Sequence, residues 1–309
     1  MRIGIIGCGN IAPYWMKAAQ VLSVEIAAVC DGNAEALQKY EEYRGFSGVD
    51  EMIAADIPLD AVVVATNPSS HADVAYRTMT AGIPTIIEKP LAENREDVTG
   101  LADFARSRNV FLGAAFHAAR APEVLWFREH RNELEEGMSA LCGFECTFLD
   151  PNASEDGIAV RARGLHGSYL DSGVNALSVL EGLFGIRRFR CLNFSPSLLE
   201  STTVASNTVY TDGNICGNII TDWTQDRNYK CTRLYYEKGV IVLNHSEREI
   251  TVVMADSRNT IPLADPTLAR MEEQYVLVLS EMRDRLQTGQ SNLIEALDIH
   301  AVLFDSDLS

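Results

Sequence analysis

The sequence predicts an α/β fold in which an N-terminal Rossmann dinucleotide-binding domain precedes an α+β domain with a large open, mostly antiparallel sheet. Through residue 116, short apolar runs alternate with helix-like segments, a pattern typical of a parallel sheet covered on both faces. After that, consecutive strand-like runs are joined by short turns, which is typical of antiparallel pairing. We expect a dinucleotide-binding domain of residues 1–117 and a substrate-binding and oligomerisation domain of residues 118–309. A C-terminal helix that packs back on the first domain is also compatible with this division.

The clearest motif of the first domain lies near its start. An apolar run meets Gly7-Cys8-Gly9-Asn10-Ile11-Ala12, and a helix-like segment and a second apolar run ending at Asp31 follow. This is the strand–turn–helix–strand–acid order of a dinucleotide-binding unit. Gly7 permits the tight turn, and Gly9 lets the backbone approach a pyrophosphate at the helix N-terminus. Glycines also occur in ordinary turns, so the assignment of the motif depends on this order of elements around it.

Asp31 predicts the choice of cofactor. Its carboxylate would accept hydrogen bonds from ribose hydroxyls and repel a 2′-phosphate, so we expect NAD rather than NADP. The alternative role is to cap the helix that begins near Asn33.

The remaining elements of the first domain follow from apolar periodicity. The predicted strands are Ile3–Ile6, Ile26–Val29, Ala61–Ala65, Thr85–Ile87 and Val110–Ala115. The predicted helices lie near Ala12–Leu22, Ala34–Tyr43, Asp50–Ala55, His71–Ala81 and Arg95–Arg108. Gly82 fits the C-cap of the fourth of these helices.

The second domain begins with a helix near Ala121–Glu136 and continues mainly as strands. The predicted strands are Met138–Leu149, Arg187–Ser195, Thr202–Tyr210, Ile215–Thr224, Lys230–Tyr236, Val240–Asn244 and Glu249–Met254. The predicted helices are Leu170–Phe184, Leu268–Thr288 and Leu293–Phe304.

Composition excludes some partners. A net charge of −17 supplies no basic field for nucleic acid or an anionic membrane. The seven cysteines have no framework spacing, which indicates free thiols and a reducing, cytoplasmic location. We expect no metal site, since Cys142 and Cys146 have no matching ligand pair. The sequence shows neither a signal peptide nor an apolar run of membrane-spanning length.

Ligands of open parallel sheets bind beyond the carboxyl ends of the strands. The segments there are Gly7–Ala12, Asp31, Thr66-Asn67-Pro68, Glu88-Lys89-Pro90 and Phe116-His117. Pro90 ends its strand and holds Lys89 at the rim of the cofactor site. A lysine there can bind a substrate hydroxyl and stabilise the alkoxide that develops as hydride leaves. The alternative is a solvated surface lysine.

These motifs together resemble the Gfo/Idh/MocA oxidoreductases, named for glucose–fructose oxidoreductase and inositol dehydrogenase. The similar segments are Gly7–Ala12, Thr66-Asn67-Pro68-Ser69-Ser70-His71 and Glu88-Lys89-Pro90, and the domain order matches over essentially the whole chain. The resemblance implies that Lys89 is catalytic. It also implies that the turn with Asn67, Pro68 and His71 lies beside the adenosine and nicotinamide riboses. We expect the cofactor-binding residues to be Gly7, Cys8, Gly9, Asn10, Ile11, Asp31, Thr66, Asn67, Pro68, His71, Glu88 and Lys89.

The family's Asp-x-Gly-x-His segment reads Asp171-Ser172-Gly173-Val174-Asn175 here. Asparagine cannot act as a general base, but it can bind a sugar hydroxyl. This form is similar to the L-arabinose and D-galactose 1-dehydrogenases of the family. The segments Phe116–Arg120, with His117, and Asp222-Trp223 resemble substrate-site segments of the same subgroup. Asp31-Gly32 departs from the Ser-Arg that often follows the second strand there and suits NADP.

Each of these side chains has an alternative role. Asp171 could be a helix N-cap and His117 a core histidine. Trp223 could be sheet core or a sugar-stacking platform. Glu145 lies on a strand that would back the substrate site and could bind a hydroxyl. Arg163 and His166 could be substrate contacts or ordinary loop residues.

We predict oxidation of a galactose- or arabinose-like aldose at C1, with hydride passing to NAD and a lactone formed. Lys89 would stabilise the oxyanion, and Asp171 or Lys89 would accept the proton. Asn175 and His117 would orient ring hydroxyls. The open sheet predicts a homodimer or homotetramer. The alternatives are a dehydrogenase acting at another carbon of a hexose, amino sugar or inositol, and a non-catalytic nucleotide-binding regulator.

Overall fold

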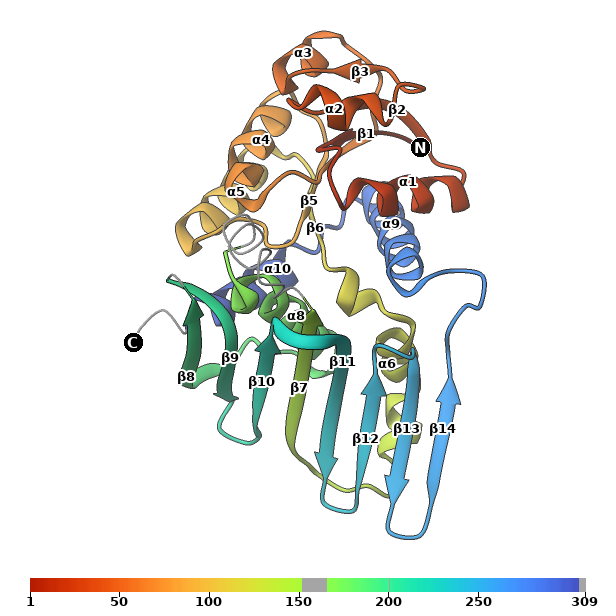
Figure 1. The fold of residues 1–309 in the computed structure, drawn as a ribbon, viewed down its shortest axis with the longest axis vertical. Helices are drawn as coiled ribbons and strands as arrows, with labels where there is room; N and C mark the ends of the chain where they lie inside the picture. Colours follow the sequence, from red (N-terminus) through yellow and green to blue (C-terminus); the bar gives the residue numbers. More distant parts are fainter. Residues whose placement is uncertain (152–165, 200, 306–309) are drawn as a thin grey trace. The chain divides into compact units, whose positions relative to one another are not determined.

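The structure, a computed structural model, describes residues 1–151, 166–199 and 201–305 (Figure 1). The chain divides into two compact units. The first unit comprises Met1–His117 and Met271–Leu297, and the second comprises Ala118–Arg270 and the chain from Asp298 onward. The segment Met271–Leu297 lies in the first unit although it follows the strands of the second in sequence.

The first unit is built on six parallel strands in the order β3-β2-β1-β4-β5-β6. These strands are β1 Arg2–Ile6, β2 Glu25–Cys30, β3 Gly45–Phe46, β4 Ala61–Val64, β5 Thr85–Glu88 and β6 Leu112–Ala115. The helices between them are α1 Ala12–Val21, α2 Ala34–Gln38, α3 Val49–Ala54, α4 Pro68–Thr80 and α5 Arg95–Arg108. This is the predicted Rossmann sheet, with β3 as a two-residue strand that the sequence pattern missed.

Helix ends in this unit follow local chemistry. Asn33 caps α2 by accepting from the Glu35 amide at 2.9 Å, so Asp31 is not the cap of this helix. Gly82 has a φ of 76° just past α4, and the Ile83 amide returns to the Thr78 carbonyl, which confirms the predicted C-cap.

Two helices end the chain, α9 Arg270–Thr288 and α10 Leu293–Leu303, and α9 contributes to the core of the first unit. Tyr275, Val278, Leu279 and Met282 of α9 pack in one apolar cluster with Ile3 and Trp15. Asn292 donates to the Ala114 carbonyl at 2.8 Å and accepts from the Ala114 amide at 2.9 Å. This side chain thereby satisfies backbone groups of β6, the edge strand of the sheet.

The second unit carries an eight-stranded sheet in the order β14-β13-β12-β11-β7-β10-β9-β8. Its strands are β7 Leu141–Pro151, β8 Arg190–Leu199, β9 Thr202–Thr211, β10 Cys216–Asp222, β11 Thr224–Tyr236, β12 Gly239–Asn244, β13 Glu249–Met254 and β14 Arg258–Pro262. All neighbours pair antiparallel except β7 and β10, which are parallel. The fold class predicted from the sequence is confirmed.

Helices α6 Pro122–Glu135 and α8 Val174–Phe184 contact this sheet, α6 against β12 and β13 and α8 against β7. On β7, Phe144 packs against Phe184 and Phe189, so the even-numbered side chains of this strand face the helices. On the other face, Tyr235 is 37% exposed. The predicted helix Leu170–Phe184 begins as a π-helical turn, η2 Tyr169–Gly173.

Candidate functional site

The carboxyl edge of the parallel sheet gathers the segments predicted to bind the cofactor. β1, β2, β4 and β5 are neighbours in this sheet, and each ends at one of the predicted segments. Since parallel strands place their carboxyl ends at one edge, these segments lie side by side.

The glycine-rich turn depends on a close approach between β1 and β4. Gly7 has a φ of 102°, and a Cβ there would lie 2.5 Å from the Ala65 carbonyl carbon and oxygen. A Cβ at Gly9 would have no heavy atom within 4 Å in the described part of the chain. The first helix, α1, starts after Ile11 without a side-chain cap. The open space at Gly9 and the uncapped amides of α1 therefore fit a pyrophosphate.

Asp31 holds this turn through its carboxylate. Asp31 Oδ2 accepts from the Cys8 amide at 2.7 Å, and Oδ1 accepts from the Asn33 amide at 2.7 Å. The Cys8 thiol is buried, and burial, followed by the nearby Asp31 charge, raises the pKa of this thiol to about 11. Cys8 therefore serves the turn through its backbone and stays a protonated thiol.

His71 connects two more of the predicted segments. Its buried imidazole lies 2.8 Å from the Pro90 carbonyl oxygen through Nδ1 and 3.0 Å from the Thr66 carbonyl oxygen through Nε2. Burial lowers the pKa of His71, while the two carbonyls oppose that shift. Thr66 Oγ1 also accepts from Ser70 Oγ at 2.8 Å. The Thr66-Asn67-Pro68 loop and the Glu88-Lys89-Pro90 segment are thus held together.

Lys89 follows a buried acid. Glu88 is 4% exposed and accepts from the Trp15 indole at 2.8 Å. Burial raises the pKa of Glu88 to about 7, and the positive charge of Lys89 opposes this shift. The same charge acts on His71. The half-buried Lys89 ammonium therefore lies within electrostatic reach of two groups that support the cofactor edge.

His117 begins a short 3-10 helix, η1 His117–Arg120, just after β6, and its ring is mostly enclosed. It is 6% exposed, lies 2.9 Å from Gln274 Oε1 through Nδ1, and stacks on Tyr275 with ring centroids 5.4 Å apart. These contacts with α9 support the core alternative for His117 more than a substrate role.

The second unit places Asp171 and Asn175 on one continuous helical segment. Asp171 lies within η2, with its amide donating to the Gly167 carbonyl at 3.1 Å, so it is not a helix N-cap. Asn175 Nδ2 donates to the Asp171 carbonyl at 3.2 Å. Asn175 is 6% exposed, and its Oδ1 has no hydrogen-bond partner among the described residues. A buried acceptor of this kind requires a donor, which a ligand hydroxyl can provide.

The side chains of Trp223 and Glu145 both have partners within the second unit. Trp223 is fully buried, and its indole donates to Ser172 Oγ at 3.2 Å, so it packs beside the Asp171 turn and is not an exposed stacking platform. Glu145 pairs with Arg233 at 2.6 Å on the face away from α8, because successive side chains of a strand alternate between faces. Glu145 therefore has a cross-strand partner, and its contact with a substrate hydroxyl stays a prediction. His166 is exposed, and Arg163 lies outside the described residues.

Sequence reasoning missed Asp150 and Lys230. They form an ion pair at 2.5 Å on the helix-facing side of the second sheet, and Asp150 Oδ2 accepts from Ser172 Oγ at 3.2 Å. The available signal was the position of Lys230 in the same alternating series as the fully buried Thr232 and Leu234.

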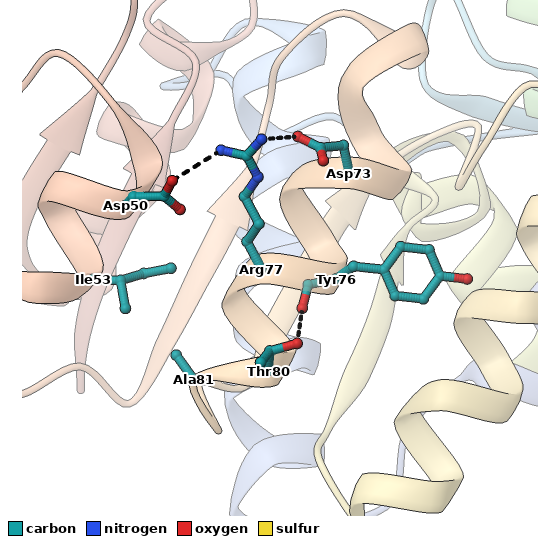
Figure 2. A pocket seen from close by; sticks show the side chains of 7 residues that line it. All are labelled: Asp50, Ile53, Asp73, Tyr76, Arg77, Thr80 and Ala81. Atoms are coloured by element: carbon teal, nitrogen blue, oxygen red, sulfur yellow. Dashed lines mark hydrogen bonds and ion pairs between the residues drawn. The ribbon is translucent and has the colours of Figure 1, made fainter.

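A separate cleft of about 380 Å³ lies on the first unit between α3 and α4. Figure 2 shows the Arg77 guanidinium between the carboxylates of Asp50 and Asp73. Its nitrogens lie 3.3 Å from Asp50 Oδ2 and 3.0 Å from Asp73 Oδ2. The lining residues are Asp50, Ile53, Asp73, Tyr76, Arg77, Thr80 and Ala81, and none of them is a predicted site residue.

Within the described ranges, no group of three or more His, Cys, Asp or Glu side chains is arranged to hold a metal ion. The same ranges contain no helix long and apolar enough to cross a membrane.

The N-terminal part of the first unit is similar to a known protein family. Residues 1–116 match the Gfo/Idh/MocA family, described as an oxidoreductase family with an NAD-binding Rossmann fold. This part of the chain is similar to that family.

Individual relatives are similar to the chain over different shares of its length. The chain is 30% identical over 132 residues to UDP-N-acetylglucosamine 3-dehydrogenase of Acidithiobacillus ferrooxidans, covering 42% of this chain and 41% of the relative. It is 22% identical to the NADP-dependent scyllo-inositol 2-dehydrogenase of Bacillus subtilis over 96% of this chain and 93% of that one. Several curated relatives are matched over only 41%, 56% and 57% of their length.

The fold extends over the whole chain. A levoglucosan dehydrogenase solved with NADH and levoglucosan superposes with a TM-score of 0.85 at 19% identity, covering 99% of this chain and 95% of that one. At this identity, the match establishes the fold.

The two glycines of the turn predict different defects. Gly7→Ala should lower the free energy of unfolding by about 2 kcal/mol or more, because a positive φ and a backbone clash both oppose a Cβ. Gly9→Ala should leave stability within about 0.5 kcal/mol and weaken dinucleotide binding at least about tenfold. Chemical denaturation and calorimetric titration with NAD measure the two effects. Equal stability loss in both variants would contradict this division.

Glu88 predicts a pH-dependent stability difference. Its folded-state pKa, raised to about 7, means that its contribution to stability is complete below about pH 4.5 and is lost as pH rises through 7. Glu88→Gln should therefore gain about 2 kcal/mol relative to wild type between pH 5 and pH 8. Denaturation at both pH values tests this, with exposed Glu42→Gln as the control. A pH-independent difference would show that Glu88 is ionised in both states.

Proposed function

We propose that the chain is an NAD-dependent dehydrogenase that oxidises a CH–OH group of a sugar or cyclitol. The observation that carries this proposal is the position of Lys89 at the end of β5, on the same sheet edge as the glycine turn and Asp31. The matched relatives are dehydrogenases of a sugar nucleotide and of an inositol, which supports this substrate class.

The residues have complementary chemical roles. A bound nicotinamide supplies the hydride acceptor. The Lys89 ammonium would donate to the reacting hydroxyl oxygen and stabilise negative charge that develops there. Asp171 would accept the hydroxyl proton, with Lys89 as the other acceptor. The buried Asn175 Oδ1 would accept a hydrogen bond from a second hydroxyl of the substrate and so fix its orientation.

Two positions of oxidation have support. The relatives act at C3 of an amino sugar and on an inositol, which favours a ring carbon other than C1. Asn175 replaces the family histidine and resembles the aldose 1-dehydrogenases, which favours C1 and a lactone product. The relatives give oxidation at another carbon the stronger support, and C1 oxidation of an aldose is retained as the finer proposal from the sequence.

The cofactor and assembly are proposed on separate grounds. Relatives use either NAD or NADP, and the Asp31 carboxylate favours NAD because it would repel a 2′-phosphate. On edge strand β8, Leu192 is 55% and Leu198 is 60% exposed. Apolar area of this kind supports a homodimer or homotetramer through the second sheet.

A substrate panel tests the function. Free aldoses, cyclitols and sugar nucleotides are incubated with NAD or NADP, and reduced cofactor is followed by absorbance. Lys89→Met should lower kcat at least about 100-fold and leave NAD affinity within about twofold, because it removes only the charge at the reacting oxygen. The exposed Lys39→Met is the matched control. Unchanged turnover in Lys89→Met would overturn the mechanism, and NAD binding with no turnover of any compound would favour a regulator.

Asp31 predicts the direction of a cofactor switch. Asp31→Ser should remove the repulsion of a 2′-phosphate and one acceptor of the Cys8 amide. We expect the ratio of NAD to NADP efficiency to fall at least about tenfold, measured as kcat/KM for each cofactor. A ratio that stays constant would show that Asp31 is a turn residue only.

A further inference from the structure

The turn that carries Asp171 lies against a buried polar part of the second sheet. η2 contacts β9 and β10. Thr221 of β10 pairs with Phe148 of β7 and with Ser206 of β9, so all three side chains lie on the helix-facing side of the sheet. Tyr210, four residues after Ser206 on β9, faces the same way. Ser206 is 4% exposed and Thr221 and Tyr210 are fully buried. Each of these hydroxyls therefore needs a hydrogen-bond partner inside the protein.

A chain of two tyrosine hydroxyls holds the first residue of η2. The hydroxyls of Tyr169 and Tyr210 are hydrogen-bonded to each other, and Tyr169 also donates to the Leu303 carbonyl at 3.0 Å. A phenol has one proton to donate, so Tyr210 is the donor to Tyr169. Burial, followed by the proximity of Tyr169, raises the pKa of Tyr210 well above its ordinary value, which keeps this donor protonated. Leu303 ends α10, where carbonyls lack helical partners. The tyrosine chain thus links β9, η2 and the end of α10.

A second chain of hydroxyls holds the residue just before η2. Thr221 Oγ1 donates to Ser168 Oγ at 3.1 Å, and Ser206 Oγ lies 2.8 Å from Thr221 Oγ1. Since the one hydroxyl proton of Thr221 goes to Ser168, Ser206 is the donor to Thr221. Ser168 is fully buried, as Thr221 is. This serine–threonine chain links β9 and β10 to the start of the turn.

The backbone approaches the sheet at the same point. Gly167 has a φ of 95°, and a Cβ there would lie 2.7 Å from the Thr203 carbonyl oxygen of β9. Backbone contact and the two hydroxyl chains therefore fix residues 167–169 on the sheet. The π-helical turn that follows is a rare conformation that occurs frequently at functional sites. Relaxation of this turn to the α-helical register would rotate Asp171 about the helix axis relative to Asn175.

We propose that Tyr169, Tyr210 and Thr221 are positioning residues for the dehydrogenase reaction, because their hydroxyl chains hold the π-helical turn that sets the direction of Asp171. This inference rests on the role given to Asp171 under the proposed function. Stability alone does not require these hydroxyls, since apolar groups of the same shape in place of both partners of a buried pair are nearly neutral. The inference therefore predicts a loss of catalysis that exceeds any loss of folding.

The first test separates turnover from binding. With the fastest substrate of the panel, Tyr210→Phe and Thr221→Val should each lower kcat about tenfold, while KM and NAD affinity stay within about twofold. Thr221→Ser keeps the hydroxyl and should keep the wild-type kcat. Tyr236→Phe is the matched control, because it removes a buried phenol that donates to Glu135 of α6 at 2.6 Å. An unchanged kcat in Tyr210→Phe, or an equal fall in Tyr236→Phe, overturns the inference.

The second test asks whether the tyrosine chain acts through Asp171. Tyr210→Phe should lower kcat about tenfold in the wild-type background and less than about twofold when Asp171 is already replaced by Asn. An equal fall in both backgrounds overturns the inference and leaves the proposed function standing. Full turnover by Asp171→Asn overturns the proposed function itself.

Hydrogen exchange tests the turn without any substrate. In Tyr210→Phe, the amides of residues 169–175 should exchange at least about tenfold faster than in the wild type, because the turn has lost an anchor. The amides of α6 should exchange at the wild-type rate. Tyr236→Phe should leave residues 169–175 unchanged. Wild-type exchange of these residues in Tyr210→Phe overturns the inference, whatever the variants do to turnover.

Discussion

The close approach of Gly7 to the Ala65 carbonyl is the constraint on which the first unit depends. It leaves no room for a Cβ, and it turns the chain from the end of β1 directly into α1. The amides at the start of α1 then point at the space that Gly9 leaves open, where a pyrophosphate fits. Asp31 secures the same turn from β2 by accepting the Cys8 amide. Folding and cofactor recognition therefore share one set of backbone contacts.

Charge is concentrated at the two places where the proposed chemistry needs it. In the first unit, the buried Glu88 lies beside Lys89, with Trp15 fixing the carboxylate. In the second unit, the buried Lys230 lies among acids, with Asp150 fixing the ammonium. Each buried charge has a partner, as the cost of desolvation requires. In the first unit the buried Glu88 directly precedes Lys89, and in the second unit Asp150, the partner of Lys230, contacts Ser172, the residue after Asp171.

The sequence predicted the elements that are set by local patterns and missed those set by distant contacts. Alternating apolar runs and the glycine turn were sufficient for the Rossmann sheet, because burial on both faces leaves a continuous apolar signature. The parallel pairing of β7 with β10 could not be predicted from local patterns, because β8 and β9 separate these two strands in the sequence. The face of β7 on which Glu145 lies was not predicted, because the face of a strand residue depends on a register that a one-residue shift reverses. Asp150 and Lys230 are 80 residues apart, and no local motif joins them.

The most direct test of the central claim follows hydride from a defined carbon of the substrate to the cofactor. Aldose deuterated at C1, and in a parallel sample at C3, is oxidised with NAD, and the reduced cofactor is examined by NMR for deuterium at C4 of the nicotinamide. The account predicts transfer of the label to that carbon, from C1 if the finer proposal is correct and from C3 if its competitor is. A reduced cofactor with no substrate deuterium, or NAD binding without reduction, would contradict the assignment of this protein as a sugar dehydrogenase.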